Sequence, residues 1–488
     1  MRLLIVPLLF LGCNVDNTLN NKDKDPGTFD TGDPWTPPFD THDTAPPVEE
    51  ECNGYDDDGD GEIDEGFPDD DANGRADCED ESCPPLDLGT AGETTVNEEC
   101  LGETSTSSGE VSDPWNVAIK WTYSRHGSSW MQPVIGNLND DDGDGDVDED
   151  DTPEVVISCS DNVLVVLNGA DGSEEWTASA NGYAGAIIAD IDSDGYPDVV
   201  TANSQGKTIA YEGDGTAKWT ANDMLSSLNY MLHNVADLDE DGNPEIIHDS
   251  MVLNGEDGTE DFEMSVPTSG WNYRLPGIAD VDNDGDQEIA LQGNLYDSDG
   301  SLLWESGESG SYGFWPVIIQ ADSDPEAEIG FVGDNWTLWE DDGTQIFSVN
   351  YGSVHQPGPP CAGDFDGDGT AEVAWPAYQT FVMYELDGTP VWSVPMDDTS
   401  GLAGCSGYDL NNDGALEILY ADQSSFTIFD GATGAELYVD NTHRSPTIFE
   451  YPTVADIDHD GHAEILVAHY GSGTALTAYV HNGDGWPA

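Results

Sequence analysis

An acidic loop that recurs along the chain is the feature that most limits its possible folds. Its clearest copy lies in the segment ADIDSDGYPDVVTA (189–202), where positions 1, 3, 5, 6 and 9 of the loop are Asp190, Asp192, Asp194, Gly195 and Asp198. Carboxylate oxygens in this order, with the backbone carbonyl of Tyr196 at position 7, are the hard ligands that Ca²⁺ prefers at six or seven coordination. Position 12 is Thr201 instead of the glutamate of an EF-hand, and the β-branched residues before it indicate a strand. The segment therefore predicts a calcium loop between β-strands.

The same frame occurs seven more times at a nearly constant period. In five complete copies, positions 1, 3, 5, 7 and 9 are Asp237, Asp239, Asp241, Asn243 and Glu245; Asp280, Asp282, Asp284, Asp286 and Glu288; Asp364, Asp366, Asp368, Thr370 and Glu372; Asp409, Asn411, Asp413, Ala415 and Glu417; and Asp456, Asp458, Asp460, His462 and Glu464. The two irregular copies are Gln320, Asp322, Asp324 and Glu328, with Pro325 in place of the glycine, and Asn137, Asn139, Asp141 and Glu154, with an acidic insertion. First positions lie 53, 47, 43, 40, 44, 45 and 47 residues apart, and such a period in β-rich units predicts a β-propeller. We expect the loop with Pro325 to be empty or the weakest calcium site, because proline cannot take the left-handed turn that glycine allows.

These motifs also carry a family resemblance. Residues 125–482 resemble the FG-GAP/VCBS repeats of integrin α-subunit propellers and of bacterial secreted proteins, through the acidic loops and through flanking apolar segments such as AIIADID and PDVV. The resemblance implies an all-β propeller with four antiparallel strands, A to D, in each blade. It also implies Ca²⁺ in the loop between strands A and B, and ligand recognition on the opposite face. It implies no single activity, because this fold hosts adhesins, lectins and lyases.

The two ends of the repeat region predict how the ring closes. The last unit begins normally at YPTVADIDHDGHAEILVAHY, but the chain ends at NGDGWPA before a strand D. The segment WNVAIKWTYS (115–124) resembles the strand-D segment TAKWTAN (216–222) and precedes the first strand A. We therefore expect residues 115–124 to pair into the last blade, which leaves no open sheet edge. This arrangement favours eight blades, and the seven blades of integrins are the alternative.

The residues before the propeller divide into four segments. Residues 1–12 resemble a signal peptide ending before a lipoprotein-type cysteine, so Cys13 is the expected lipidation site; an ordinary signal peptide is the alternative. Residues 13–50 are rich in Pro, Thr and Asp and predict a disordered linker. An Asp/Cys-rich module (51–84) and a second linker (85–112) precede the propeller (113–488). We expect an exported lipoprotein at the outer membrane or cell surface, or alternatively a secreted protein.

The Asp/Cys-rich module repeats the acidic frame twice. The residues concerned are Asp56, Asp58, Asp60, Asp64, Asp69, Asp71, Asn73 and Asp77. With cysteines alongside, the segment resembles the calcium modules of secreted proteins, including thrombospondin type 3 repeats, and a solvated acidic linker is the alternative. An exported chain normally pairs its cysteines. Cys361 and Cys405, near the ends of neighbouring strands A, are a plausible pair, although sequence does not fix the connectivity.

The charge of the chain limits its partners. Ten Lys and Arg residues face 101 Asp and Glu residues, giving a net charge of -91. Nucleic-acid binding requires a basic surface, so this composition excludes it. The surplus also indicates a surface that suits high salt or repels anionic membranes. We expect a monomer.

The sequence favours a binding protein over an enzyme. It contains neither G-x-S-x-G nor H-E-x-x-H, and few cations are present to neutralise the substrate of a polysaccharide lyase. We expect no enzymatic activity but recognition of a glycan or protein ligand; a lyase and a passive surface scaffold are the alternatives. Aromatic residues precede the loops by seven positions at Trp130, Tyr183, Tyr230, Tyr273 and Phe449, where they stack on ligands or pack between blades. Where this pattern fails, Trp315, Tyr351 and His355 are the candidate ligand contacts.

Overall fold

The computed structural model describes most of the predicted propeller. The described residues are 111, 113–141, 143, 147, 151–222, 232–239, 242–266, 274–308, 314–322, 324–351, 356–483 and 485–487. The predicted signal peptide, Cys13, the 13–50 linker and the 51–84 module lie outside them, as do Asp241 and His355. Among the described residues, no helix has the length and hydrophobicity of a membrane span.

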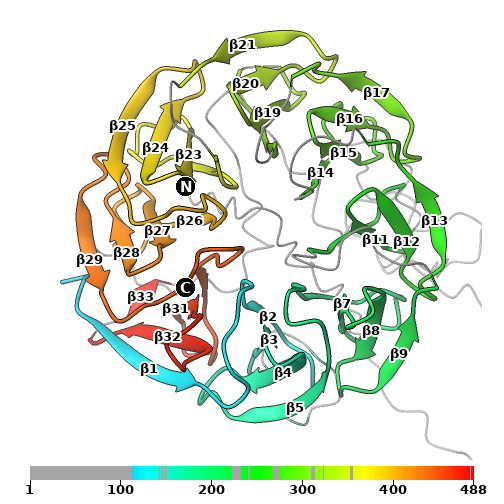
Figure 1. Ribbon diagram of the computed structural model, residues 1–488, viewed down its shortest axis with the longest axis vertical. Helices are drawn as coiled ribbons and strands as arrows, with labels where there is room; N and C mark the ends of the chain where they lie inside the picture. Colours follow the sequence, from blue (N-terminus) through cyan, green and yellow to red (C-terminus); the bar gives the residue numbers. More distant parts are fainter. Residues whose placement is uncertain are drawn as a thin grey trace, which may run out of the picture. The chain divides into compact units, whose positions relative to one another are not determined.

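Eight antiparallel sheets form a ring, with strand A of each blade nearest the axis and strand D at the rim (Figure 1). Blade 1 contains β2 (Val134–Gly136), β3 (Glu154–Cys159), β4 (Val163–Asn168) and β5 (Glu174–Ser179). Blade 2 contains β6 (Ile187–Ala189), β7 (Asp198–Ala202), β8 (Thr208–Glu212) and β9 (Ala217–Thr220). Blade 3 contains β10 (Asn234–Ala236), β11 (Glu245–His248), β12 (Met251–Asn254) and β13 (Glu260–Glu263).

The next four blades follow the same order. Blade 4 contains β14 (Gly277–Ala279), β15 (Glu288–Leu291), β16 (Asn294–Tyr296) and β17 (Leu302–Glu305). Blade 5 contains β18 (Trp315–Ile319), β19 (Glu328–Val332), β20 (Trp336–Trp339) and β21 (Gln345–Val349). Blade 6 contains β22 (Cys361–Gly363), β23 (Glu372–Ala377), β24 (Thr380–Glu385) and β25 (Pro390–Pro395). Blade 7 contains β26 (Cys405–Tyr408), β27 (Glu417–Ala421), β28 (Phe426–Phe429) and β29 (Glu436–Asp440).

The eighth blade joins the two ends of the propeller. It contains β30 (Thr453–Ala455), β31 (His462–Ala468) and β32 (Leu476–His481), and its strand D is β1 (Val117–Tyr123). β1 pairs antiparallel with β32, from Val117 opposite His481 to Tyr123 opposite Leu476. A short strand, β33 (Trp486–Pro487), pairs with the start of β31. The predicted eight blades and the predicted closure by residues 115–124 are confirmed, and the seven-bladed alternative is wrong.

The order of the strands gives the ring two chemically different faces. Because the strands within a blade are antiparallel, all A–B loops and C–D turns lie on one face, which we call the loop face. The B–C turns and the connections from strand D to the next strand A lie on the other, which we call the opposite face. Strand B is buried along most or all of its length in every blade because it lies between strands A and C and between neighbouring blades. Strand D alternates in exposure, as expected at a rim.

A repeated aromatic clamp joins neighbouring blades. The indole of Trp219 in strand D of blade 2 donates a hydrogen bond of 2.8 Å to the carbonyl of Gly255 in blade 3. The ring also lies over Gly258 in the C–D turn, where an added Cβ would come within 2.4 Å of it. Equivalent indole bonds join Trp121 to Gly169, Trp176 to Gly213, Trp304 to Asp341 and Trp392 to Gly431. In these five blades, the indole therefore ties strand D to the neighbouring blade.

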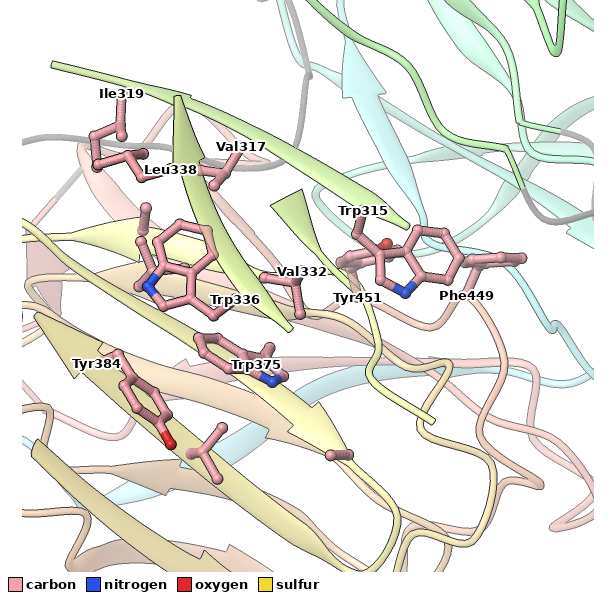
Figure 2. Close-up of a cluster of buried hydrophobic side chains, with 14 of the residues drawn as sticks. Trp315, Val317, Ile319, Val332, Trp336, Leu338, Trp375, Tyr384, Phe449 and Tyr451 are labelled. Carbon is pink, nitrogen blue, oxygen red and sulfur yellow. The ribbon is translucent and has the colours of Figure 1, made fainter. Parts of the chain in front are cut away.

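Apolar side chains continue the packing through the ring. One cluster contains Trp315, Trp336 and Trp375 of blades 5 and 6 together with Phe449 and Tyr451, which precede strand A of blade 8 (Figure 2). The pairing of Cys361 with Cys405 is confirmed, and this disulfide joins strands A of blades 6 and 7. These contacts cross between blades, so each blade depends on its neighbours for burial.

Removal of β1 tests the closure. A variant that begins at Met131 exposes the edge of β32, so we expect a lower melting temperature and aggregation measured by light scattering. A variant that begins at residue 111 keeps β1 and is the matched control. Equal stability of the two variants as monomers would contradict this closure.

The aromatic clamp makes a second prediction. Trp219→Ala removes an indole hydrogen bond and ring packing, and we expect a loss of about 3 kcal/mol in the free energy of unfolding, measured with denaturant. Leu302→Ala changes an exposed residue of another strand D and should alter stability by less than about 0.5 kcal/mol. An equally small change in the Trp219→Ala variant would show that the clamp contributes little to the free energy of unfolding.

Candidate functional site

Five of the acidic loops share one backbone geometry on the loop face. The carboxylate at position 1 accepts hydrogen bonds from the N–H groups at positions 5 and 6, as Asp190 does from Asp194 at 3.1 Å and from Gly195 at 2.8 Å. The same pair of bonds is made by Asp280, Asp364, Asp409 and Asp456. Position 6 has a positive φ, 88° at Gly195 and 104° at Gly285, which is why glycine recurs there. The sequence frame therefore corresponds to one folded loop.

The residue at position 9 links each loop to strand B. It is the first residue of strand B in blades 1 to 7. Where it is a glutamate, one of its carboxylate oxygens accepts the N–H of position 2. The glutamates that make this bond are Glu154, Glu245, Glu288, Glu328, Glu372, Glu417 and Glu464. The second oxygen of several of these glutamates lies near the aspartates at positions 1 and 3. Oxygens of Asp237, Asp239 and Glu245, of Asp280, Asp282 and Glu288, and of Asp364, Asp366 and Glu372 lie within 4.8 Å of one another.

The acidic loop of blade 6 has the geometry expected of a cation site. Glu372 is 1% exposed; its Oε2 accepts the N–H of Phe365 at 2.8 Å, and its Oε1 is buried without a hydrogen-bond partner. Burial, opposed by that hydrogen bond and reinforced by repulsion from Asp366, raises the pKa of Glu372 to about 8. An unpartnered buried oxygen beside two further carboxylates is the environment that a hard divalent cation satisfies. The donor set of this loop therefore fits Ca²⁺.

The glutamates at position 9 of other blades also have raised pKa values. Burial first, and then repulsion from the loop aspartates, raises the pKa of Glu288 to about 8 and that of Glu417 to about 9. Burial likewise raises the pKa of Glu154 to about 8, with repulsion from Glu175 and Asp141 as lesser causes. These shifts describe the protein without a cation, in which too much negative charge is held close together.

Two loops contain a lysine from their own blade. In blade 2, carboxylate oxygens of Asp190, Asp192 and Asp194 lie within 4.8 Å of one another. Nζ of Lys218 lies 2.5 Å from Asp192 and 3.0 Å from Asp198 at position 9. In blade 8, Nζ of Lys120 lies 2.9 Å from Glu464 and also pairs with Asp458. Both lysines lie in segments that the sequence predicts as strand D, but their contacts with the loops were not predicted.

The loop of blade 5 is organised by an amide. Nε2 of Gln320, at position 1, donates hydrogen bonds to the carbonyl of Asp324 at 2.6 Å and to that of Glu326, at position 7, at 3.2 Å. The position-7 carbonyl is a ligand in the predicted calcium loop, so the amide competes with an ion for it. Oxygens of Asp322, Asp324 and Glu340 still lie within 4.8 Å of one another. This arrangement supports the expectation of a weak site here.

The loop of blade 1 gains a residue that sequence reasoning missed. Asp151, from the acidic insertion, is 1% exposed and accepts the N–H of Asp141 at 2.8 Å. Nδ2 of Asn139 donates to Glu154 at 2.8 Å and to Glu175 in strand D at 3.0 Å. The clue was the insertion itself, since its last acids return to the loop before strand B.

The opposite face contains a partly exposed aromatic cluster. Trp130 precedes strand A of blade 1, and its ring centroid lies 5.2 Å from that of Tyr183, which precedes strand A of blade 2. On its other side, Trp130 lies 3.6 Å from Tyr470, in the B–C turn of blade 8. All three side chains are half-buried. The register analysis found Trp130 and Tyr183 but not Tyr470, which lies outside the repeated position.

The other aromatic candidates have packing roles in this structure. Trp315 is 0% exposed, and its indole donates to the carbonyl of Pro357 at 2.6 Å (Figure 2). Without exposed surface it offers no platform for a ligand, because its apolar ring completes the core. Tyr351 is half-buried, packs on Trp375 at 5.5 Å and donates its hydroxyl to the carbonyl of Gly333. Phe449 is likewise buried, whereas Tyr230, Tyr273 and His355 lie outside the described residues.

Comparison with known proteins agrees with the repeats and the fold. The model of the FG-GAP-like repeat matches residues 146–201, 190–248 and 409–467. The chain therefore contains FG-GAP-like repeats on an eight-bladed β-propeller. No curated protein sequence matches the chain significantly.

Solved structures with the same fold have diverse roles. The V. cholerae biofilm matrix protein Bap1 is 18% identical with a TM-score of 0.66, over 76% of this chain and 92% of that one. The exotype rhamnogalacturonan lyase YesX is 15% identical with a TM-score of 0.54, over 75% and 76% of the two chains. A rhamnogalacturonan lyase of Bacillus licheniformis is 19% identical with a TM-score of 0.50, over 76% and 73%. At these identities the likeness shows the fold alone.

The raised pKa values predict an unusual pH dependence without calcium. The pKa of Glu372 rises from 4.5 to about 8 on folding, so between these values the folded state holds more protons than the unfolded state. Stability must then fall as the pH rises through this window. In excess EDTA we expect the melting temperature to fall between about pH 5.5 and about pH 8.5.

Millimolar calcium should largely remove this fall, since the ion binds the ionised carboxylates. Glu372→Gln removes one titrating group and should make the fall in EDTA shallower. A melting temperature in EDTA that stays constant or rises over this range would contradict the prediction.

Proposed function

We propose that this protein is a calcium-stabilised extracellular binding or adhesion protein, which recognises a glycan or protein ligand on the face opposite the calcium loops. The observation that carries the proposal is the cluster of Trp130, Tyr183 and Tyr470. It draws on three neighbouring blades and keeps aromatic surface accessible on the opposite face. Aromatic rings bind the apolar faces of sugars and the side chains of peptides, and their polar tips add direction.

Calcium has a structural role in this proposal. Binding to the folded loops alone stabilises the protein by mass action. Site affinities of about 10⁻⁴ to 10⁻³ M are typical of extracellular modules, where calcium is abundant. The ion therefore holds the loop face together while the opposite face remains free for recognition.

Several features support a location outside the cytoplasm. The disulfide between Cys361 and Cys405 is typical of exported proteins. The fold is shared with a biofilm matrix protein, and the predicted lipid at Cys13 with its acidic linker would hold the propeller away from a membrane. We propose a cell-surface lipoprotein, monomeric and without affinity for nucleic acid.

A polysaccharide lyase is the alternative, favoured by the likeness to two rhamnogalacturonan lyases. Such chemistry needs positive charge near the substrate carboxylate. All six Lys and Arg side chains of the described propeller are already held by acids or carbonyls: Lys120, Arg125, Lys207, Lys218, Arg274 and Arg444. Bound calcium would therefore have to supply that charge, and we place binding ahead of catalysis.

The test is a glycan array probed with the full chain in millimolar calcium. We expect binding to a defined sugar that Tyr183→Ala or Tyr470→Ala weakens at least about tenfold, because each removes stacking surface. Tyr196→Ala is the matched control, since its side chain is 50% exposed on the loop face and should not matter. Loss of binding in the control but not in the other variants would place recognition on the loop face.

The same preparation distinguishes the enzyme. Incubation with pectic substrates should leave the absorbance of unsaturated uronates unchanged if the protein only binds. A time-dependent rise that EDTA abolishes would favour the lyase instead.

A further inference from the structure

Strand D carries one distinctive position in every blade. A register shift in the pairing of strands C and D leaves one residue of strand D unpaired. This bulge residue stands immediately before an aromatic residue of strand D in every blade. In chain order of the strands these bulge residues are Lys120, Glu175, Lys218, Asp261, Leu303, Ile346, Val391 and Leu437. Blades 4 to 7 therefore have an apolar bulge residue, whereas blades 2 and 8 have a lysine.

Both lysines reach the same two positions of the acidic loop in their own blade. Nζ of Lys218 lies 2.5 Å from Asp192 at position 3 and 3.0 Å from Asp198 at position 9. Its side chain is 9% exposed, so the pair is shielded from water. A lone surface ion pair would be exposed and would have no reason to select these positions.

Lys120 repeats the contact from another part of the chain. Its Nζ lies 2.9 Å from Glu464 at position 9 and pairs with Asp458 at position 3, with a side chain that is 16% exposed. Lys120 belongs to β1 and Glu464 to β31, so the contact joins the first and last strands of the propeller. Two lysines far apart in the sequence thus make equivalent contacts from equivalent bulges.

An ammonium group and a calcium ion cannot share this place. Ca²⁺ needs its oxygens at about 2.3–2.6 Å, and positions 3 and 9 supply two of them. A nitrogen at hydrogen-bond distance from both carboxylates occupies that volume and repels the ion. It also supplies positive charge without a free cation, and its attachment to the chain removes the entropy cost of capturing one.

We propose that Lys120 and Lys218 take the place of Ca²⁺ in blades 8 and 2, so that these two acidic loops fold without binding calcium. Loops with an apolar bulge residue and an aspartate at position 1, such as that of blade 6, depend on the ion. The closure between β1 and β31 is then held by an internal charge pair. The ring stays closed when calcium is low, while other blades lose their ions.

Calcium stoichiometry tests the proposal. The full chain is titrated with calcium alone by isothermal calorimetry, after removal of metal, as wild type and as Lys120→Met and Lys218→Met. Each variant frees a complete set of carboxylates, and we expect each to bind one more ion per chain than the wild type. Lys207→Met is the matched control, because Lys207 contacts the carbonyls of Ala221 and Asn222 and should leave the count unchanged.

The reverse substitution keeps the proposal falsifiable if a methionine variant does not fold. Val391→Lys places a lysine at the bulge of blade 6, and we expect it to bind one ion fewer than the wild type. An unchanged count in folded Lys120→Met and Lys218→Met variants would overturn the proposal. An unchanged count in Val391→Lys would do the same if neither methionine variant folds.

Discussion

The buried carboxylate at the start of strand B is the group on which each blade depends. In blade 6, one oxygen of Glu372 accepts the N–H of Phe365 and the other is buried without a partner. The carboxylate also lies close to those of Asp364 and Asp366. The hydrogen bond to Phe365 fixes the connection between strands A and B. The three neighbouring carboxylates concentrate negative charge at a site that is partly shielded from water. The ionised form of such a group is stable only beside a positive charge. An ion fits this requirement in blade 6, and lysines meet it in blades 2 and 8.

Electrostatic interactions stabilise the loop face, whereas aromatic packing stabilises the contacts between blades. On the loop face, acids are compensated one loop at a time, within a blade. Between blades, aromatic clamps such as the contact of Trp219 with Gly255 and Gly258 hold neighbouring blades together at the rim. These contacts need no ion. Calcium loss is therefore expected to loosen individual loops before it opens the ring. The opposite face does not take part in this compensation, which leaves Trp130, Tyr183 and Tyr470 available for a ligand.

Much of this fold could be predicted from the sequence, because its signals are local and repeated. A single acidic loop would be weak evidence for any fold, but eight copies in register predict the number of blades. The absence of a strand D after the last loop predicts that residues 115–124 close the ring. The sequence could not separate a buried aromatic from an exposed one, so Trp315 was a candidate ligand contact although it lies in the core. It also could not show that Lys218 and Lys120 reach the loops, because a bulge in strand D sets the direction of their side chains. Asp151 was missed for the same reason, since the return path of an insertion is a tertiary property.

The most direct measurement is an anomalous difference map from crystals of the protein grown with calcium. Our account predicts an ion in the loop of blade 6 bound by Asp364, Asp366 and Glu372, with comparable ions in blades 4 and 7. It predicts the ammonium groups of Lys120 and Lys218, and no ion, between the carboxylates of blades 8 and 2. Absence of an ion from blade 6 at saturating calcium would contradict the central claim that a positive charge completes the acidic loops that begin with an aspartate. An ion in blade 2 with Lys218 displaced into solvent would contradict the role given to the lysines.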